Sequence, residues 1–588
     1  MKWVMVLLGG LIMATVAHAG VGRVWAVNDG EKVDRDDLKN ANRDKNSAWD
    51  GTTVRIFGAC NEVIAFQVIV ESDDKGIEGL SVSLPELAGP DGRKLSYAPP
   101  REDPTDFVGR QIQLFSAHYL DVKEVTTCSW IFDRKSPAAP TNPTGWKPVI
   151  LVPENAAAGK GGFPLSVAAN NTQAFWIEIY TPRDLPPGTY KGAVTVRAGT
   201  QTTQLPVELE VFPFALPDQN SMKAMLYFEA SQLDKYHGAA LEDRYQRFGH
   251  RQRVELVNAN SEAEVTRNIG RFNGKAFTKE NGYEGPGEGV GNVIVPATFY
   301  GPGSRFDDQA SAYKASDAWM EFLNKNVPGA MTFLYLPDEP SRQVFPRILK
   351  IGENIHKNPG PGSKLPVFVT HRISEELAPA IDMWSSPTES FKADQAARET
   401  QAGKLVSVYN GHRPHAGSFD YSVPATDPRA TMWGCFKFSI PLYFYWHANH
   451  WQHNEQKPAD RDQNIWANSV TFDNRRQVSK PGGGFANGDG VVLYPGQEKV
   501  HPEEDRGIVG PCGSYQLANL RRGLQDHLYL TMARELGLKE VVEQTTGAVA
   551  GKMFSEAEKT IGFAQTGNEF EAARLKLAQA ITSAKKAK

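Results

Sequence analysis

Two adjacent carboxylates, Asp338 and Glu339, end the apolar run 333–336 and lie between Pro337 and Pro340. Neighbouring acids repel each other, and burial would penalise their charges further, so such a pair favours a raised pKa and a proton donor near neutral pH. Cleavage of a glycosidic bond needs this donor on the leaving oxygen, and it needs a group that stabilises the positive sugar ring. The alternative is a surface loop with two solvated acids, and the dipeptide alone does not separate the two interpretations.

Eight short apolar runs beyond residue 217 are candidate strands, and stretches of helical periodicity separate them. The runs are 224–228, 254–257, 292–295, 331–336, 366–370, 381–384, 404–409 and 441–446. Ser316 is the expected N-cap of a helix around Trp319, and the apolar residues of 345–355 recur at the same period. Eight such units in about 250 residues predict a (β/α)8 barrel of the TIM type, whose catalytic side chains come from the carboxyl ends of the strands. The run before Asp338 is the fourth of them.

The protein is expected to be multidomain, because residues 20–216 carry a different pattern of short alternating strands with Pro and Gly between them. Clear examples are 62–70, 175–180, 193–196 and 205–211. They predict an N-terminal β-sandwich, which the proline-containing run 212–217 should close, since proline cannot continue a central strand. We expect the barrel over 217–535, with an elaborated loop at 259–291, and a C-terminal helical segment over 536–588.

The first 19 residues have the marks of a cleavable signal peptide. Met1 and Lys2 precede the apolar run 3–16, and the segment ends in Ala-His-Ala before Gly20. This run is shorter than the ~20 residues that a spanning helix needs. We therefore expect a protein exported to the periplasm or the cell exterior, with no membrane insertion after cleavage. Scattered Lys and Arg and a net charge of -4 argue against a nucleic-acid partner. The sequence leaves the oligomeric state open.

Neither the cysteines nor the histidines indicate a metal or another cofactor. The cysteines are Cys60, Cys128, Cys435 and Cys512. Their spacing fits neither a zinc ribbon nor a redox C-x-x-C; Cys60 could pair with Cys128, and four free buried thiols are the alternative. His447, His450 and His453 recur every third residue, and neither helix nor strand geometry gathers all three on one side.

The string Tyr335-Leu336-Pro337-Asp338-Glu339-Pro340 resembles the catalytic motif of glycoside hydrolase family 123, the β-N-acetylgalactosaminidase family. Further segments similar to this family follow in order along the chain, namely 381–384, 443–446 with Trp451, 490–496 and 520–530, and the N-terminal region with its Leu216-Pro217 exit is similar too. The resemblance covers nearly the whole mature chain. The chain departs from the family at 447–450 and in the extended region 451–488, which leaves the sugar's identity and exo or endo action open.

The resemblance implies a retaining, substrate-assisted mechanism on sugars with a 2-acetamido group, which needs no enzyme nucleophile. Carried onto this sequence, Glu339 protonates the leaving oxygen and later deprotonates water. Asp338 accepts the acetamido N–H and steadies the developing positive charge. Adjacent side chains of a regular strand point to opposite faces, so both can reach one sugar only if the backbone bends at the strand end.

Sugar sites stack rings on aromatic faces and fix hydroxyls with a few polar groups, so the partner we expect is a glycan. Candidate contacts at the strand ends are Tyr300, Tyr335, His371, Arg372, Trp384, Tyr409, Asn410, Trp446 and Trp451. Each is also a possible packing residue, and Trp446, Tyr409 and Asn410 come first. Two alternatives stay open: a two-carboxylate glycosidase that pairs Glu339 with Asp382 on sugars lacking the acetamido group, and an inactive carbohydrate-binding protein.

Overall fold

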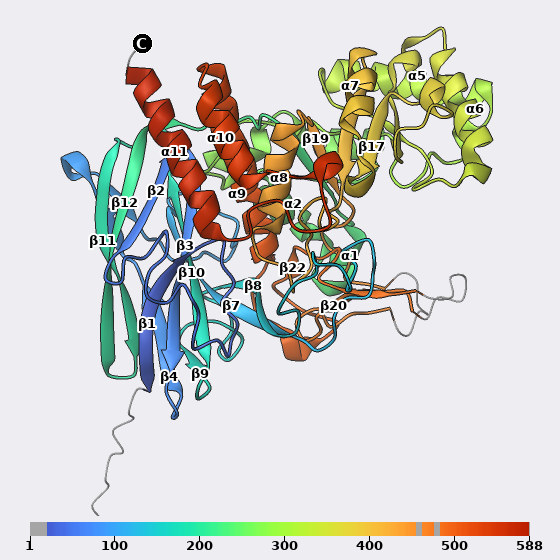
Figure 1. The fold of residues 1–588 in the computed structure, drawn as a ribbon. Coiled ribbons are helices and arrows are strands. Elements are labelled where there is room, and N and C mark those ends of the chain that lie inside the picture. Colours follow the sequence, from blue (N-terminus) through green and yellow to red (C-terminus); the bar gives the residue numbers. More distant parts are fainter. Residues whose placement is uncertain (1–19, 454–460, 476–482, 587–588) are drawn as a thin grey trace, which may run out of the picture.

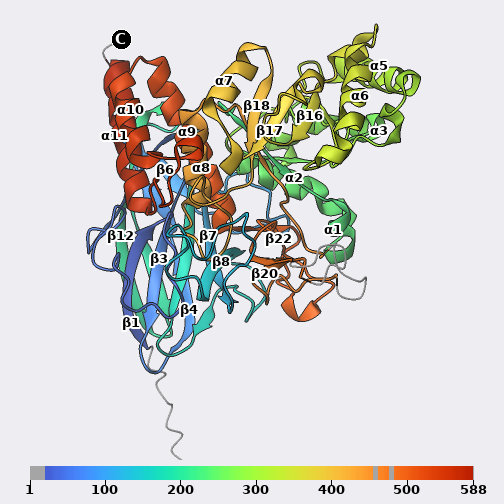
Figure 2. The same ribbon diagram turned by 45° about the vertical axis from the view of Figure 1, so that its right-hand side comes forward.

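The computed structural model describes residues 20–453, 461–475 and 483–586, and the predicted signal peptide lies outside these ranges. The protein is a multidomain arrangement of β-sheets and helices (Figure 1). Long N-terminal strands form one end of the molecule, a parallel sheet with its helices forms the other, and the C-terminal helices stand between and beside them (Figures 1 and 2). Within the described ranges, every helix is too short or too polar to cross a membrane.

Two sheets are built mainly from the N-terminal third of the chain. The first has the order β1 (Val21–Asn28), β3 (Glu62–Ser72), β10 (Thr172–Thr181), β7 (Ile112–Val122), β8 (Gly145–Pro153), β23 (Pro511–Ser514) and β22 (Tyr494–Pro495). The second has the order β2 (Val54–Cys60), β12 (Gln201–Ala215), β11 (Gly188–Ala198), β4 (Ile77–Ser83) and β9 (Leu165–Val167), with β5 (Glu86–Ala88) and β6 (Lys94–Ser96) beside β11. Buried side chains of both sheets belong to one hydrophobic cluster.

Strand β12 does not end where the prolines predicted. It continues through Pro213 to Ala215 and pairs in parallel with β2, with a shift of register between Val211 and Ala215. A proline is tolerated at such an irregularity, because the ladder there does not need its missing N–H. The next strand begins at Lys223.

The second half of the chain forms a seven-stranded parallel sheet. Its order is β14 (Glu255–Val257), β13 (Lys223–Tyr227), β19 (Leu442–Tyr445), β18 (Leu405–Tyr409), β17 (Met383–Pro387), β16 (Val367–Thr370) and β15 (Leu334–Tyr335). Seven of the eight predicted runs are therefore strands. The eighth, 292–295, makes one parallel bridge from Ile294 to Met331, and Val295 N donates to Met331 O over 2.9 Å.

At the edge opposite β15, a side chain of β14 contacts the same run, 292–295. Glu255 of β14 accepts hydrogen bonds at Oε2 from Val293 N (2.9 Å) and Ile294 N (2.8 Å). Burial raises the pKa of this carboxyl. The sheet is thus curled, and a carboxylate stands where a backbone ladder would complete the predicted barrel.

The helices follow the predictions in part. Helix α6 (Phe345–His356) occupies the expected stretch. Helix α5 (Gln309–Asn326) starts earlier than expected, because Asp308 rather than Ser316 is its N-cap. Ser316 is buried in the middle of this helix, where its hydroxyl donates to Ala312 O over 2.7 Å. The predicted loop 259–291 contains two short helices, α3 (Glu262–Arg267) and α4 (Ile269–Phe272), and 3-10 turns.

The C-terminal region is helical, as expected. It comprises α9 (Tyr515–Glu535), α10 (Lys539–Val549) and α11 (Gly567–Lys586). Figure 1 shows α10 and α11 beside the N-terminal strands, with α9 and α8 (Asp427–Lys437) between these strands and the parallel sheet. Helix α9 is buried along almost its whole length, so it packs on neighbours from both halves of the chain.

Buried ion pairs link these helices to the first strands. The participants are three arginines, Arg429, Arg522 and Arg574, and four acids, Asp29, Glu62, Asp526 and Glu571. Arg522 lies 2.8 Å from Asp29, 3.1 Å from Glu62 and 2.8 Å from Glu571. A buried charge is expensive unless it is paired, so these contacts depend on one another. Although burial raises the pKa of Glu571, Arg522 and its neighbouring arginines hold it below the usual range.

All four cysteines are free thiols with buried side chains, so Cys60 and Cys128 are not paired. Burial raises the pKa of the Cys60 thiol to about 11 and that of Cys512 to about 12. Thiolates are the reactive form of cysteine, and these side chains are therefore inert in the folded protein.

Candidate active site

Asp338 and Glu339 follow β15 at the carboxyl end of the parallel sheet, and both are exposed. The backbone bends over 337–339, and Glu339 has a φ of 41°. A non-glycine residue rarely adopts a positive φ, and such local strain concentrates at functional sites. A regular strand would direct the two adjacent carboxylates to opposite faces, so both can reach one sugar only if the backbone bends. This bend is present.

Two hydroxyl groups from neighbouring strands orient the Asp338 carboxylate. Tyr335 Oη donates to Asp338 Oδ1 over 2.8 Å, and Thr370 Oγ1 donates to the same oxygen over 2.7 Å. Thr370 also accepts a hydrogen bond from Glu339 N (3.1 Å), so it contacts both acidic residues. Burial and the Asp338 charge raise the pKa of the Tyr335 phenol well above its usual value. It therefore stays a proton donor at any ordinary pH.

Glu339 receives a hydrogen bond from a third strand. Tyr409, the last residue of β18, donates from Oη to Glu339 Oε1 over 2.6 Å. Burial and the Glu339 charge raise the pKa of Tyr409. Each acid is thus held by a phenol that ends a different strand, which fixes the direction of both carboxyl groups relative to the sheet.

Three further predicted contacts meet beside this pair. Tyr300, with a φ of 50°, donates from Oη to Trp446 O over 2.5 Å, and its ring lies 5.4 Å from that of Tyr335. Asn410 Oδ1 accepts from Trp446 N over 3.1 Å. Tyr300, Asn410 and Trp446 are all partly exposed. They join the ends of three elements into one polar and aromatic wall, of the type that sugar sites use.

The Trp446 indole is fixed by a carboxylate that the sequence did not indicate. Asp489 is buried, and its Oδ1 accepts from Trp446 Nε1 (2.9 Å) and Tyr445 Oη (3.1 Å). Burial raises the pKa of Asp489. It follows no predicted strand and stands between two glycines, so only the folded chain reveals its contact with Trp446.

His371 follows Thr370 at the end of β16, but its described contacts are with Arg372 and Phe345 and not with the acidic pair. Its Nδ1 lies 2.6 Å from Arg372 O, and its ring packs on Phe345 at 5.5 Å. Burial lowers the pKa of the His371 imidazole. Arg372 is exposed beside it.

Two predicted sugar contacts, Trp384 and Trp451, are instead packing residues, since both are fully buried. Trp384 Nε1 donates to Glu399 Oε2 on α7 (Ala393–Gln401) over 2.9 Å, and Trp451 Nε1 donates to Leu493 O over 2.9 Å. Successive residues of a strand face opposite sides. Met383 belongs to the cluster among the parallel strands, so Trp384 must face the helices.

Asp382, the candidate second carboxylate, precedes the first residue of β17, at the opposite end of the sheet from Glu339. Its Oδ2 accepts from Val367 N over 2.9 Å and lies 3.0 Å from His356 Nε2. Thr370 pairs with Ser385, three residues beyond Asp382. At about 3.3 Å per residue, this places Asp382 roughly 10 Å along the strand from the level of the acidic pair. The geometry does not support a Glu339–Asp382 pair.

His447, His450 and His453 lie in sequence, with ring centroids 5.1 Å and 6.3 Å apart. Burial lowers the pKa of His450 well below its usual value. In the part of the chain that the structure describes, no group of three His, Cys, Asp or Glu side chains has the geometry to hold a metal ion. His447 instead lies 3.6 Å from Glu229, which follows β13.

Sequence reasoning missed Thr370, Asp489, Glu229 and Glu389. Glu389 follows β17 and lies 3.5 Å from His412 Nδ1. Thr370 and Glu229 stand at or just after the end of a predicted strand, whereas Glu389 lies beyond the predicted run 381–384, because β17 extends to Pro387. A search for every polar residue at such ends, rather than for aromatic residues and paired acids, would have found the first two.

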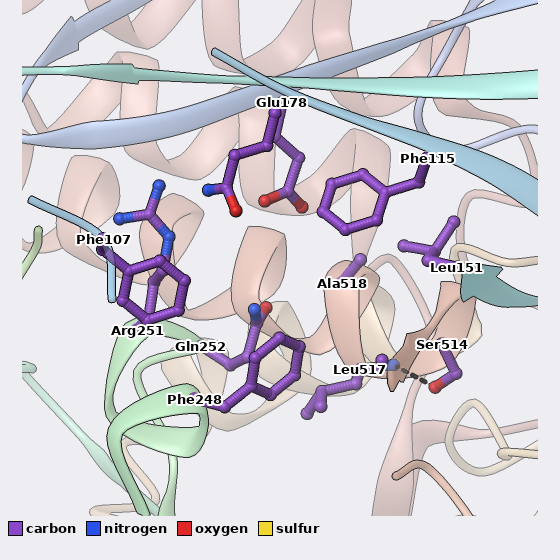
Figure 3. A pocket seen from close by; sticks show the side chains of 12 residues that line it. Phe107, Phe115, Leu151, Glu178, Phe248, Arg251, Gln252, Ser514, Leu517 and Ala518 are labelled. Atoms are coloured by element: carbon purple, nitrogen blue, oxygen red, sulfur yellow. Dashed lines mark hydrogen bonds between the residues drawn. The ribbon is translucent and has the colours of Figure 1, made fainter. Parts of the chain in front are cut away.

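A separate cavity lies where α2 (Glu242–Arg251) and the start of α9 meet the first N-terminal sheet (Figure 3). Its lining includes Phe107, Phe115, Leu151, Glu178, Phe248, Arg251, Gln252 and Leu517. Figure 3 shows the apolar rings of Phe115 and Phe248 facing this space. None of the acidic pair's neighbours lines it, so it is a gap between packed layers and not part of the candidate site.

No family model matches the chain, and no curated protein matches it. Among solved structures, it is similar to a family 123 glycoside hydrolase from Clostridium perfringens, with a TM-score of 0.61 and 13% sequence identity. That likeness covers 95% of this chain and 97% of the other. A β-glucuronidase from Parabacteroides merdae gives a TM-score of 0.23 at 13% identity over 63% of this chain and 47% of the other, which is too low to inform the fold. The expected resemblance to family 123 is thus present in the fold.

Proposed function

We propose that this chain is an exported glycoside hydrolase, and specifically a retaining, substrate-assisted β-N-acetylhexosaminidase of the β-N-acetylgalactosaminidase type. The observation that carries the proposal is the Asp338–Glu339 pair at the carboxyl end of the parallel sheet, each acid bound by a phenol from a different strand. The family 123 fold supports it.

In the proposed reaction, Glu339 donates its proton to the glycosidic oxygen as the bond to the anomeric carbon breaks. The acetamido oxygen of the same sugar attacks that carbon and forms an oxazolinium ion. Asp338 accepts the acetamido N–H, which turns the oxygen toward the carbon and stabilises the positive charge. Glu339, now a carboxylate, removes a proton from water, and the water oxygen opens the oxazolinium ring with net retention.

The surrounding hydroxyls fit these tasks. Tyr409 donates to the Glu339 oxygen at 2.6 Å and so stabilises the carboxylate that remains after proton transfer. Tyr335 and Thr370 leave Asp338 little freedom to rotate. A fixed acceptor costs no reorganisation when charge develops in the transition state.

The same proposal covers the architecture and the processing of the chain. It includes a β-sandwich over residues 20–216 and a (β/α)8 barrel over 217–535, and the hydrogen bonds from Val293 N and Ile294 N to Glu255 of β14 support the closure of that barrel. It also includes a C-terminal helical segment over 536–588, which α10 and α11 support. Removal of residues 1–19 on export would leave Gly20 as the first residue.

The test is hydrolysis of aryl β-N-acetylgalactosaminide and β-N-acetylglucosaminide by the purified mature protein, Glu339→Gln and Asp338→Asn. Loss of a general acid lowers rates by about 10²- to 10⁴-fold, and we expect both variants to fall in this range. Asp382→Asn is the matched control, because this acid lies at the other end of the sheet. A thiazoline analogue of the oxazolinium ion should inhibit strongly, as transition-state and intermediate analogues do.

Three outcomes contradict the proposal in different ways. A folded wild type that cleaves neither substrate excludes the exo-hexosaminidase. Cleavage of glycosides lacking the acetamido group, without inhibition by the thiazoline, indicates a conventional two-carboxylate enzyme. Sugar binding with no turnover of any glycan indicates an inactive carbohydrate-binding protein.

A further inference from the structure

Trp130 is the one large hydrophobic side chain that is exposed in the described ranges, at 40%. It belongs to the connection between β7 and β8 in the N-terminal region, not to the parallel sheet. Its ring meets Phe472 of β20 (Val470–Asp473) edge to face at 5.4 Å, and Phe472 meets Trp446 in the same way at 5.9 Å. Three aromatic rings therefore run from the candidate active site to a distant part of the chain.

One buried carboxylate lies beside these rings. Asp489 accepts the Trp446 indole N–H at 2.9 Å, and Trp130 is near enough to this carboxyl to affect its pKa. The edge-to-face contact with Phe472 restrains the Trp130 ring, although part of its surface faces water. Exposure of a large apolar ring is unfavourable, and a pre-oriented exposed ring is what a stacking ligand requires.

Polar groups lie near Phe472 and β21 (Phe485–Asn487), the strand that pairs with β20. The connection that carries Trp130 contacts β21, since Thr127 N and Cys128 N both donate to Phe485 O. Phe485 lines a cleft of about 280 Å³. Its polar lining includes Asp121, Lys123, His453, Asn468, Asp473 and Arg475. An exposed aromatic ring near acidic, basic and amide side chains suits a sugar, which needs both a stacking face and hydrogen-bonding groups.

We propose that Trp130, supported by Phe472, stacks on a second pyranose of the glycan, next to the residue whose bond Glu339 cleaves. This inference rests on the proposed function and extends it, because it makes an oligosaccharide rather than a single sugar the preferred ligand. It also gives the N-terminal region a direct part in substrate choice.

The test measures the affinity of full-length Glu339→Gln protein for sugars by calorimetry, so that no ligand is consumed. The probes are the free N-acetylhexosamines and oligosaccharides of two to four residues that end in β-linked N-acetylgalactosamine or N-acetylglucosamine. Loss of one stacking contact corresponds to about a 2- to 10-fold change in affinity. We expect Trp130→Ala to weaken oligosaccharide binding by this factor and to leave the single sugars unchanged.

Two matched variants separate stacking from general damage. Trp130→Phe keeps an aromatic face and should retain most of the affinity. Trp146→Ala removes a partly buried tryptophan of β8, the strand that follows the Trp130 connection; its ring is stacked beneath Arg35 at 3.4 Å, and the substitution should leave sugar affinity unchanged.

The inference is overturned if Trp130→Ala alters no affinity, if it weakens single sugars and oligosaccharides equally, or if the parent protein binds none of the oligosaccharides. Failure of the proposed function looks different. Trp130-dependent binding of oligosaccharides by a protein whose wild type cleaves none of them would remove the hydrolase assignment and leave the binding site in place.

Discussion

Replacement of Thr370 by valine tests whether the orientation of Asp338 matters for catalysis. Valine keeps the shape of the side chain but removes the hydroxyl that donates to Asp338 and accepts from Glu339 N. The substitution therefore frees both acidic residues from one contact without adding or removing a charge. Tyr335 remains as a donor to Asp338, so the carboxylate keeps part of its restraint.

The size of the effect follows from the exposure of the acid. A hydrogen bond to a charged group contributes about 1.5–3 kcal/mol. Because Asp338 is exposed, water replaces part of the lost donor, and the lower end applies. A loss of about 1.5 kcal/mol in the transition state corresponds to about a tenfold fall in kcat/KM. Stability should change little, since the freed N–H of Glu339 also reaches water.

The assay compares kcat/KM on an aryl N-acetylhexosaminide with the thermal midpoint of each variant. Thr332→Val is the control, because Thr332 is also buried but precedes β15, and its hydroxyl accepts from the buried Trp319 Nε1 at 2.9 Å. That variant should lose stability and keep its activity, the reverse of Thr370→Val. Activity of Thr370→Val within twofold of wild type, or a fall that only follows its thermal midpoint, would refute the reasoning.

Three further predictions follow from the rest of the molecule. Arg522→Met should lower the free energy of unfolding in urea by about 3–5 kcal/mol, since it leaves buried carboxylates unpaired. Arg55→Met, at an exposed ion pair, should have a much smaller effect. Asp382→Asn should return the NMR-measured pKa of His356 toward its ordinary value, because Asp382 raises this pKa. The contribution of the His356–Asp382 pair to stability is complete below about pH 6.5 and is lost as the pH rises through the raised pKa. Equal profiles of stability against pH for the variant and the wild type would contradict this prediction. A thiol reagent should label no cysteine in the folded protein and four after unfolding, and rapid labelling of the native protein would contradict the free buried state of Cys60, Cys128, Cys435 and Cys512.

The parallel strands could be predicted because each is a short apolar run bounded by polar or proline residues. Seven of these runs form strands with ends within a few residues of the expected ones. The start of α5 could not be predicted as well, because Ser316 and Asp308 are both good caps and only packing decides between them. The extent of β12 depended on an irregular register around Pro213, which is a property of its partner β2 and not of the run itself.

The candidate site divides in the same way. Asp338 and Glu339 could be placed because position at a strand end is visible in the sequence. Trp384 could not, since the face that it presents depends on the register of β17 against its neighbours. Asp489 acts through Trp446, a contact between residues 43 positions apart that no local pattern encodes.

The contacts between the two ends of the chain set the order in which the protein can be completed. Asn28 Nδ2 donates to Asn568 Oδ1, 540 residues later, and Arg574 on the last helix pairs with Glu62 at the start of β3. Strand β23 joins the N-terminal sheet only at residues 511–514. During synthesis the first strands therefore emerge long before their final partners, with Asp29 and Glu62 still lacking their arginines. The N-terminal sheet and its buried ion pairs therefore cannot be completed until residues 511–574 have been synthesised.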